Sequence, residues 1–132
     1  MAITKNRGRQ HVSSAYVDIS YADLASGVAA EAIDLPIGAQ VVGGDVVVNT
    51  AFNSGTSDVM VVGDALVANR YYASASIAAA GRNALLVTGY QSLHTSNKVR
   101  VTWTGVGAVP SAGSVRLRVD YIVNKRAMFT QG

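Results

Sequence analysis

Eight acidic residues could supply acid–base chemistry or bind a metal, but they occur singly along the chain. They are Asp18, Asp23, Glu31, Asp34, Asp45, Asp58, Asp64 and Asp120. Glycoside hydrolysis needs two carboxyl groups that face one sugar, and no spacing here favours such a pair. Asp58 and Asp64 flank a predicted strand and Asp45 follows two glycines, positions where Asp commonly bonds its own backbone. With Asn53 these three could offer calcium hard oxygen ligands, but the ligand spacing of an EF-hand is absent. We therefore predict no metal site.

Histidine, cysteine and glycine-rich motifs add no catalytic or cofactor site. The chain has no cysteine, which excludes disulfides and thiolate metal sites. His11 and His94 each lack a second ligand at metal-binding spacing, and no G-x-S-x-G motif marks a serine nucleophile. Segment 105–110, GVGAVP, begins like a phosphate-binding loop but ends in proline, so it predicts a hairpin loop. We therefore expect a protein that is not an enzyme and needs no cofactor.

Aromatic residues could stack on bases or sugars. Arg70-Tyr71-Tyr72 is the best local candidate for a surface that stacks single-stranded bases. Tyr and Trp in strands are more often core or interface residues, however. Trp103 falls on the inward face of its predicted strand, which argues against a sugar-stacking role. We therefore expect no nucleic-acid partner.

Basic residues concentrate at the two ends of the chain, which has a net charge of +3. The terminal ones are Lys5, Arg7 and Arg9, and then Lys125 and Arg126. The segment between them has six basic and eight acidic residues, a net charge of −2. We expect a flexible basic arm over 1–10, a folded domain over 11–124 and a C-terminal tail over 125–132.

The C-terminal tail also carries an apolar pair, Met128-Phe129, just after its basic residues. Such a pair on a basic tail could anchor in a groove of a neighbouring protein. The predicted partner-contact residues are therefore Lys5, Arg7, Arg9, Lys125, Arg126, Met128 and Phe129.

Short strands separated by turns account for the rest of the chain. Turn signals recur every 8–15 residues or so, and no segment sustains a helical period over twelve residues. The predicted strands lie near 11–21, 28–35, 40–50, 57–63, 70–78, 84–90, 98–104 and 114–124. Gly43-Gly44 interrupts a run of valines and predicts a bulge or bend. A short helical turn is expected near 64–69 because the segment is rich in alanine.

These strands predict an all-β, single-domain antiparallel sandwich of jelly-roll type, with an immunoglobulin-like sandwich as the alternative. Only 14% of residues are charged, against about 25% in typical globular domains. Such a surface is typical either of a domain partly covered by another protein or of an ordinary alanine- and serine-rich β-domain. We expect a homo-oligomer, a dimer in preference to a trimer.

Segment 32–123 resembles small structural proteins of tailed bacteriophages, above all capsid decoration or cement proteins with a jelly-roll sandwich. Four stretches carry the resemblance: LPIGAQVVGGDVVV at 35–48, TAFNSGTSDVMVVGD at 50–64, NRYYASASIAAAG at 69–81 and GSVRLRVDYIV at 113–123. Similar stretches occur in head-fibre and tail proteins.

The resemblance implies a non-enzymatic virion protein that binds the outside of the major capsid protein shell and cements neighbouring capsomers. The alternative is a head-fibre or tail module that binds a host receptor or glycan. The chain has no apolar run near the roughly 18 residues that span a bilayer, and its N-terminus has no apolar signal region. We therefore expect synthesis in the host cytoplasm and no membrane partner. The resemblance implies a final location on the outer capsid surface.

Overall fold

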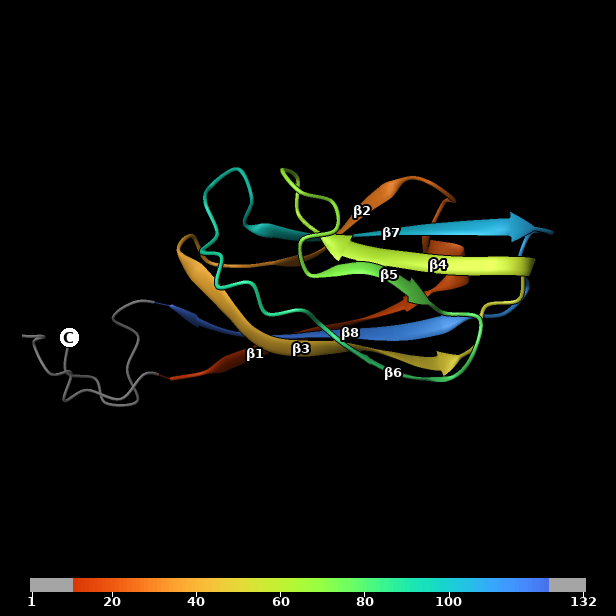
Figure 1. The fold of residues 1–132 in the computed structure, drawn as a ribbon, viewed down its shortest axis with the longest axis horizontal. Coiled ribbons are helices and arrows are strands. Elements are labelled where there is room, and N and C mark those ends of the chain that lie inside the picture. The colour runs from red at the N-terminus through yellow and green to blue at the C-terminus, as the bar shows by residue number, and fades with distance from the viewer. Residues whose placement is uncertain (1–10, 124–132) are drawn as a thin grey trace, which may run out of the picture.

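The computed structural model describes residues 11–123, which form eight strands. They are β1 (Ser13–Ser20), β2 (Ala29–Asp34), β3 (Ala39–Thr50), β4 (Gly55–Gly63), β5 (Tyr72–Ser76), β6 (Gly81–Ala84), β7 (Lys98–Gly107) and β8 (Ser114–Val123). All strand pairs are antiparallel, and the sheet orders are β1-β8-β3-β6 and β2-β7-β4-β5. The two sheets lie face to face (Figure 1). This strand order is that of a jelly roll, so the predicted fold class is confirmed.

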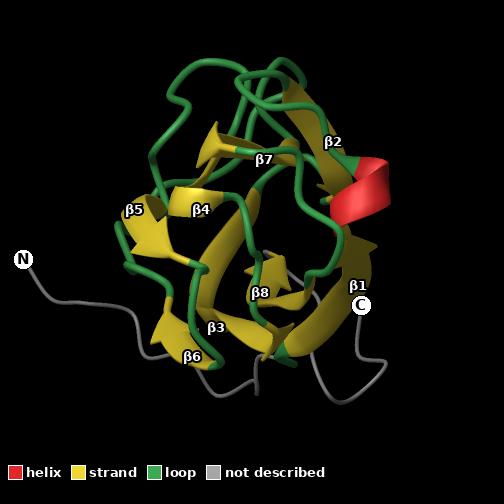
Figure 2. Cartoon of the chain, turned by 90° about the vertical axis from the view of Figure 1, so that its right-hand side faces the viewer, coloured by secondary structure: helices red, strands yellow, loops and turns green. Residues whose placement is uncertain are grey.

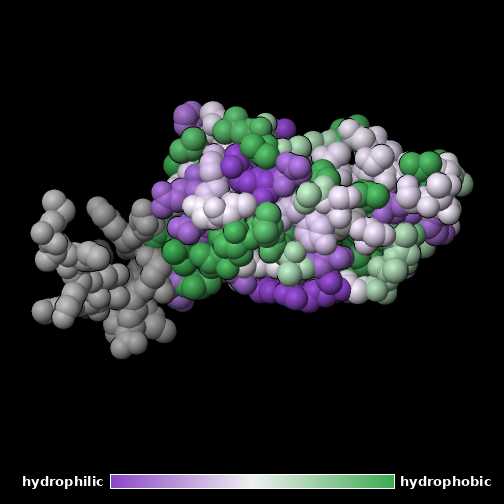
Figure 3. Space-filling view, in the orientation of Figure 1, coloured by the Kyte–Doolittle hydropathy of each residue, from purple (hydrophilic) through white to green (hydrophobic). Residues whose placement is uncertain are grey.

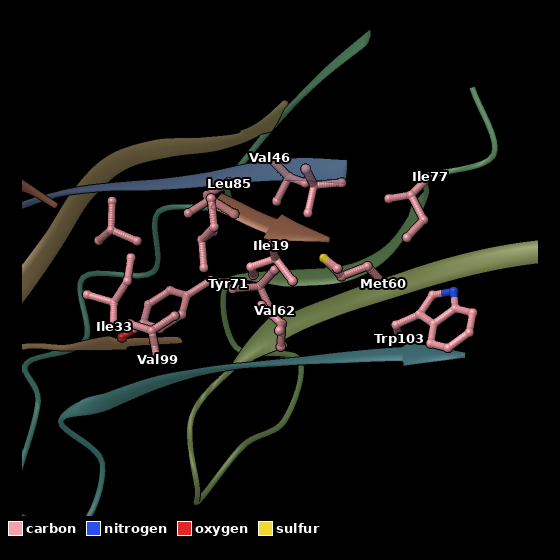
Figure 4. Close-up of a cluster of buried hydrophobic side chains, with 14 of the residues drawn as sticks. Ile19, Ile33, Val46, Met60, Val62, Tyr71, Ile77, Leu85, Val99 and Trp103 are labelled. Atoms are coloured by element: carbon pink, nitrogen blue, oxygen red, sulfur yellow. The ribbon is translucent and has the colours of Figure 1, made fainter. Parts of the chain in front are cut away.

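The inward side chains of the two sheets form one hydrophobic core. Alternate residues of β8 point inward and are fully buried: Val115, Leu117 and Val119. The facing sheet contributes Met60, Val62, Val99, Val101 and Trp103. Figure 4 shows Val46, Met60 and Val62 converging between the ribbons of the two sheets. The period-two pattern of the sequence therefore determines which face of each strand is buried.

The predicted bulge in the third strand is confirmed. The pairing of β3 with β8 shifts register between Val41 and Gly43. Gly44, next along the chain, has a φ of 141°, and a Cβ at this position would overlap the backbone carbonyl of Arg118. Only glycine tolerates both conditions without strain, which explains why the run of valines is interrupted here.

The strand predicted over 84–90 is largely wrong, since β6 ends at Ala84. The Leu85 amide donates to the Gly44 carbonyl, whereas the next amide, of Leu86, donates to the Tyr71 carbonyl just before β5. The chain therefore leaves the edge of the first sheet at Leu85 and crosses to the second. An apolar run here reflects that crossing and not a longer strand.

The helical turn expected at 64–69 is absent. Asp64 Oδ1 instead accepts hydrogen bonds from the amides of Leu66 and Val67 at 2.9 and 2.8 Å, which closes a tight turn. In the described part of the chain the helical element is a 3₁₀ turn, η1 (Tyr21–Asp23), which the sequence did not predict. Figure 2 shows it at the end of β1.

The antiparallel topology gathers the loops at two ends of the sandwich. One end, here called the arm end, holds His11, Val123 and the loops 35–38, 64–71 and 85–97. The other, the distal end, holds the loops 21–28, 51–54, 77–80 and 108–113. Figure 2 looks onto the distal end.

Candidate functional site

The partner-contact residues predicted from the sequence lie outside the described residues. They are Lys5, Arg7, Arg9, Lys125, Arg126, Met128 and Phe129. The structure does locate the points from which the two segments extend. Ser13 pairs with Tyr121 across β1 and β8, and Val123 pairs with Ala39. Both segments therefore begin at the arm end.

The carboxylates considered for a calcium site are held apart by different partners. Asp45 on β3 pairs with Arg82 and Arg118. Asp58 bonds Ser54 and Trp103, and Asp64 closes the turn after β4. Asn53 bonds the loop at Ser111. Within residues 11–123 no group of three or more His, Cys, Asp or Glu side chains could hold a metal ion.

Asp58 is the centre of a buried polar cluster near the distal end. Only 2% of its surface is exposed. It accepts hydrogen bonds from Ser54 Oγ at 2.6 Å, the Ser54 amide at 3.0 Å and the Trp103 indole Nε1 at 3.0 Å. Three donors compensate the burial of the carboxylate, and they fix the inward orientation of Trp103 that the strand pattern predicts.

A pocket of about 430 Å³ lies beside this cluster, at the distal end. Its lining includes Tyr21, Leu24, Trp103 and Val109, with Ser26 as a neutral polar group. Its lining residues carry no charge, so it would suit an uncharged ligand or an apolar side chain. No sequence pattern indicated this pocket, because its lining comes from three separate loops and from β7.

A second polar cluster joins two loops of the arm end. Arg70 Nε donates to Asp64 Oδ2 at 2.5 Å, and the guanidinium carbon lies 3.4 Å from the centre of the Tyr90 ring. Tyr90 Oη is 2.7 Å from Ser96 Oγ. Neighbouring Tyr71 is buried, and burial raises its pKa to about 12. Arg70 and Tyr71 are thus engaged inside the fold, so these two residues do not provide the exposed stacking surface that was suggested for Arg70-Tyr71-Tyr72.

The longest arm-end loop, 85–97, is tied to the turn between β2 and β3. Ser92 Oγ donates to the Pro36 carbonyl at 2.8 Å and accepts from the Ala39 amide at 3.1 Å. The Gly38 amide donates to the Ser92 carbonyl at 2.8 Å. Ser92 is itself buried. The loop is thus anchored by buried hydrogen bonds although it has no regular secondary structure.

Large apolar side chains are exposed on these anchored loops. They are Ile37, Leu66, Val67, Leu86, Val87 and Leu93. Figure 3, in the orientation of Figure 1, shows apolar side chains gathered over the loop after β4 and over the segment after β6. His94 is exposed on the same loop as Leu93. Sequence reasoning missed this surface because it assigned Leu86 and Val87 to a strand.

The outer face of the first sheet is charged but locally neutral. Arg116 makes two hydrogen bonds to Asp18, at 2.7 and 3.1 Å. Arg118 bonds both Asp120 and Asp45, and Arg82 bonds Asp45. Three arginines thus face three aspartates, an arrangement that does not favour a polyanion.

Two of these aspartates have lowered pKa values. The hydrogen bond from Arg116 lowers the pKa of Asp18. Burial of Asp45 acts in the opposite direction, but the hydrogen bonds and positive charges of Arg118 and Arg82 outweigh it, and the pKa of Asp45 is lowered. Both carboxylates therefore remain charged at neutral pH.

None of the helices in residues 11–123 is long and apolar enough to cross a bilayer.

By sequence, the chain matches no protein-family model and no curated protein. By structure, it is similar to chains from three bacteriophage capsids.

The cyanophage Pam1 capsid asymmetric unit contains a chain with a TM-score of 0.73 and 24% identity, over 93% of this chain and 91% of that one. The capsid of Ralstonia phage GP4 gives 0.65 and 19%, over 93% and 90%. The acid-stable capsid of Helicobacter pylori bacteriophage KHP30 gives 0.62 and 20%, over 85% and 87%. At these identities the likeness establishes a shared fold.

Proposed function

We propose that this protein is a non-enzymatic structural component of a bacteriophage virion. It binds the outside of the major capsid protein shell and cements neighbouring capsomers, which stabilises the head. The observation that carries the proposal is the match of nearly the whole sandwich to chains from three phage capsids. The protein is made in the host cytoplasm and is found on the outer capsid surface.

The surface chemistry supports a role in protein contacts. The outer face of the first sheet is locally neutral, and the loops of the arm end expose apolar side chains. The two basic terminal segments begin at the same end. Many copies on a lattice, each making modest contacts, would bind with high avidity. A homodimer would let one molecule of the assembly bridge two neighbouring capsomers.

The experiment removes the gene for this chain from the phage genome that carries it. Particles lacking the protein should form but release DNA at a lower temperature than complete particles. Adding the purified full chain should restore heat resistance at a saturating, fixed stoichiometry, and image reconstruction should show it on the outer face. Particles equally heat-resistant with and without the chain would refute the cementing role.

A second candidate function, a head-fibre or tail module that binds a host glycan, is favoured by the uncharged distal pocket with Tyr21 in its lining. Binding of the isolated chain to defined glycans, lost in Tyr21→Ala but kept in Tyr16→Ala on the sheet face, would support it. An absence of glycan binding at millimolar concentration would refute it.

A further inference from the structure

We propose that the arm end is the surface that docks on the capsid shell, and that it meets an apolar patch bordered by acidic side chains. This inference rests on the proposed function and specifies which end of the sandwich performs it. Leu66 is 56% exposed and Leu86 is 62% exposed, in two loops that contact each other through Arg70 and Tyr90. Exposed apolar groups gathered in this way mark interaction sites.

The loops that display these side chains are held in place before any partner binds. The Asp64–Arg70 ion pair and the stacking of Arg70 on Tyr90 fix loop 64–71 against loop 85–97. Buried Ser92 then fixes loop 85–97 against the turn at 35–38. A preorganised apolar surface loses little conformational entropy on binding. By holding the loops in one conformation, these bonds suit a surface that must fit a rigid shell.

The charge of the arm end divides into two zones that define the partner. Within loops 35–38, 64–71 and 85–97 the charged side chains are Asp64 and Arg70, which pair with each other. The surface opposite the loops should therefore be apolar. The terminal segments 1–10 and 124–132, which begin at this end, carry five basic residues. The partner surface around the loops should therefore be acidic.

The length of the C-terminal segment limits which surfaces Met128 and Phe129 can contact. Phe129 lies six residues beyond Val123, so it can reach about 20 Å from the end of β8. The ten residues of β8 span about 34 Å. Met128 and Phe129 therefore cannot reach the distal pocket of their own molecule, but they can reach a partner that faces the arm end.

The distal end provides a matched comparison for a mutational test. Val28 is 57% exposed and Val109 is 90% exposed there. Full-length Leu66→Ser/Leu86→Ser and Val28→Ser/Val109→Ser variants are compared with the wild type for binding to shells purified from a strain that lacks this gene. All four side chains are more than half exposed, so equal melting temperatures are expected and are checked first.

The arm-end double variant should bind shells more than about tenfold more weakly, and the distal double variant should stay within about twofold. If the distal variant binds shells more weakly than the arm-end variant, or if the two variants bind equally, the inference is overturned and the proposed function still stands. A wild type that does not bind shells would overturn the proposed function, and the inference with it. If the arm-end variant loses self-association but keeps its shell affinity, the occupant is a second copy and the inference is wrong.

The acidic border is tested by carbodiimide crosslinking of the wild-type complex, followed by mass spectrometry. The three lysines are Lys5 and Lys125 in the terminal segments and Lys98 at the start of β7. Crosslinks from Lys5 or Lys125 to Asp or Glu of the shell are expected. Crosslinks to the shell from Lys98 alone would overturn the assignment of acidic groups around the arms.

Discussion

Asp45 makes the stability of the first sheet depend on pH. Its side chain is almost buried and bonds Arg82 at 2.7 Å and Arg118 at 3.1 Å. Because its pKa in the folded protein lies below the ordinary value of 3.8, its charge stabilises the fold above that pH. The contribution is lost as the pH falls through the lowered pKa. Asp45→Asn should lower the free energy of unfolding at pH 7 by about 1–2 kcal/mol, measured by urea denaturation.

The pH series distinguishes this charge effect from a packing effect. The difference between wild type and Asp45→Asn should be constant from neutral pH to about pH 5 and shrink below it. Asp18→Asn, at an exposed ion pair with Arg116, is the matched control and should have a smaller effect at pH 7. A difference for Asp45→Asn that does not change with pH would show that its role is packing.

The residue roles that could not be predicted are those that depend on hydrogen bonds between side chains far apart in the sequence. Trp103 was expected to face inward because its strand alternates in polarity, and it is 4% exposed. Its bond to Asp58, however, joins residues 45 positions apart, and Arg118 bonds Asp45 across 73 positions. Such pairs depend on the register of neighbouring strands. Polarity patterns predict the face of a strand but not the register between strands.

At the scale of elements, the bulge in β3 depends on Gly44. Alanine at this position would bring a Cβ into the Arg118 carbonyl and close to Leu85, and would also force a non-glycine residue to a φ of 141°. The Arg118 carbonyl belongs to the backbone of β8, so it cannot move away without disturbing the pairing of β3 with β8. Gly44→Ala should therefore lower the free energy of unfolding by about 3 kcal/mol or more, as measured by urea denaturation.

Gly38→Ala is the control for the backbone conformation alone. Gly38 also has a positive φ, 85°, but a Cβ there would meet nothing within 4 Å. Its replacement should cost only about 1–2 kcal/mol, the cost of a left-handed conformation. Equal losses for the two variants would show that close packing at Gly44 does not matter to the bulge.

Strand prediction succeeded where polarity alternates and failed where the chain crosses between sheets. The observed β7 and β8 begin at Lys98 and Ser114, where the sequence placed strands. In contrast, Leu85, Leu86 and Val87 form an apolar run without alternation. Leu85 is buried, whereas the next two residues are exposed on a loop. Apolar content alone does not separate a strand from an exposed apolar surface.

At the scale of the whole molecule, the jelly-roll order has a functional consequence. Because the eight strands alternate in direction along the sandwich, the start of the first strand and the end of the last strand lie at the same end. The sequence predicted two basic segments, but not that they begin beside exposed apolar loops. That juxtaposition follows from topology, and it is what makes the basic segments candidates for gripping one partner surface.

The role of the basic N-terminal segment in binding the shell is tested by changing this segment while leaving the sandwich intact. Two variants of the full chain are compared: a deletion of residues 1–10, and Lys5→Gln/Arg7→Gln/Arg9→Gln, which keeps the length and removes the charge. Because the first strand begins at Ser13, both should melt at the wild-type temperature. Both should occupy shells about tenfold less at limiting concentration, since each lost ion pair is repeated across the lattice.

Wild-type occupancy should fall with rising salt, whereas the occupancy of the glutamine variant should depend less on salt. Unchanged occupancy of the deletion variant would exclude the segment from the contact. Loss in the deletion but not in the glutamine variant would assign the grip to chain length and packing, and not to charge.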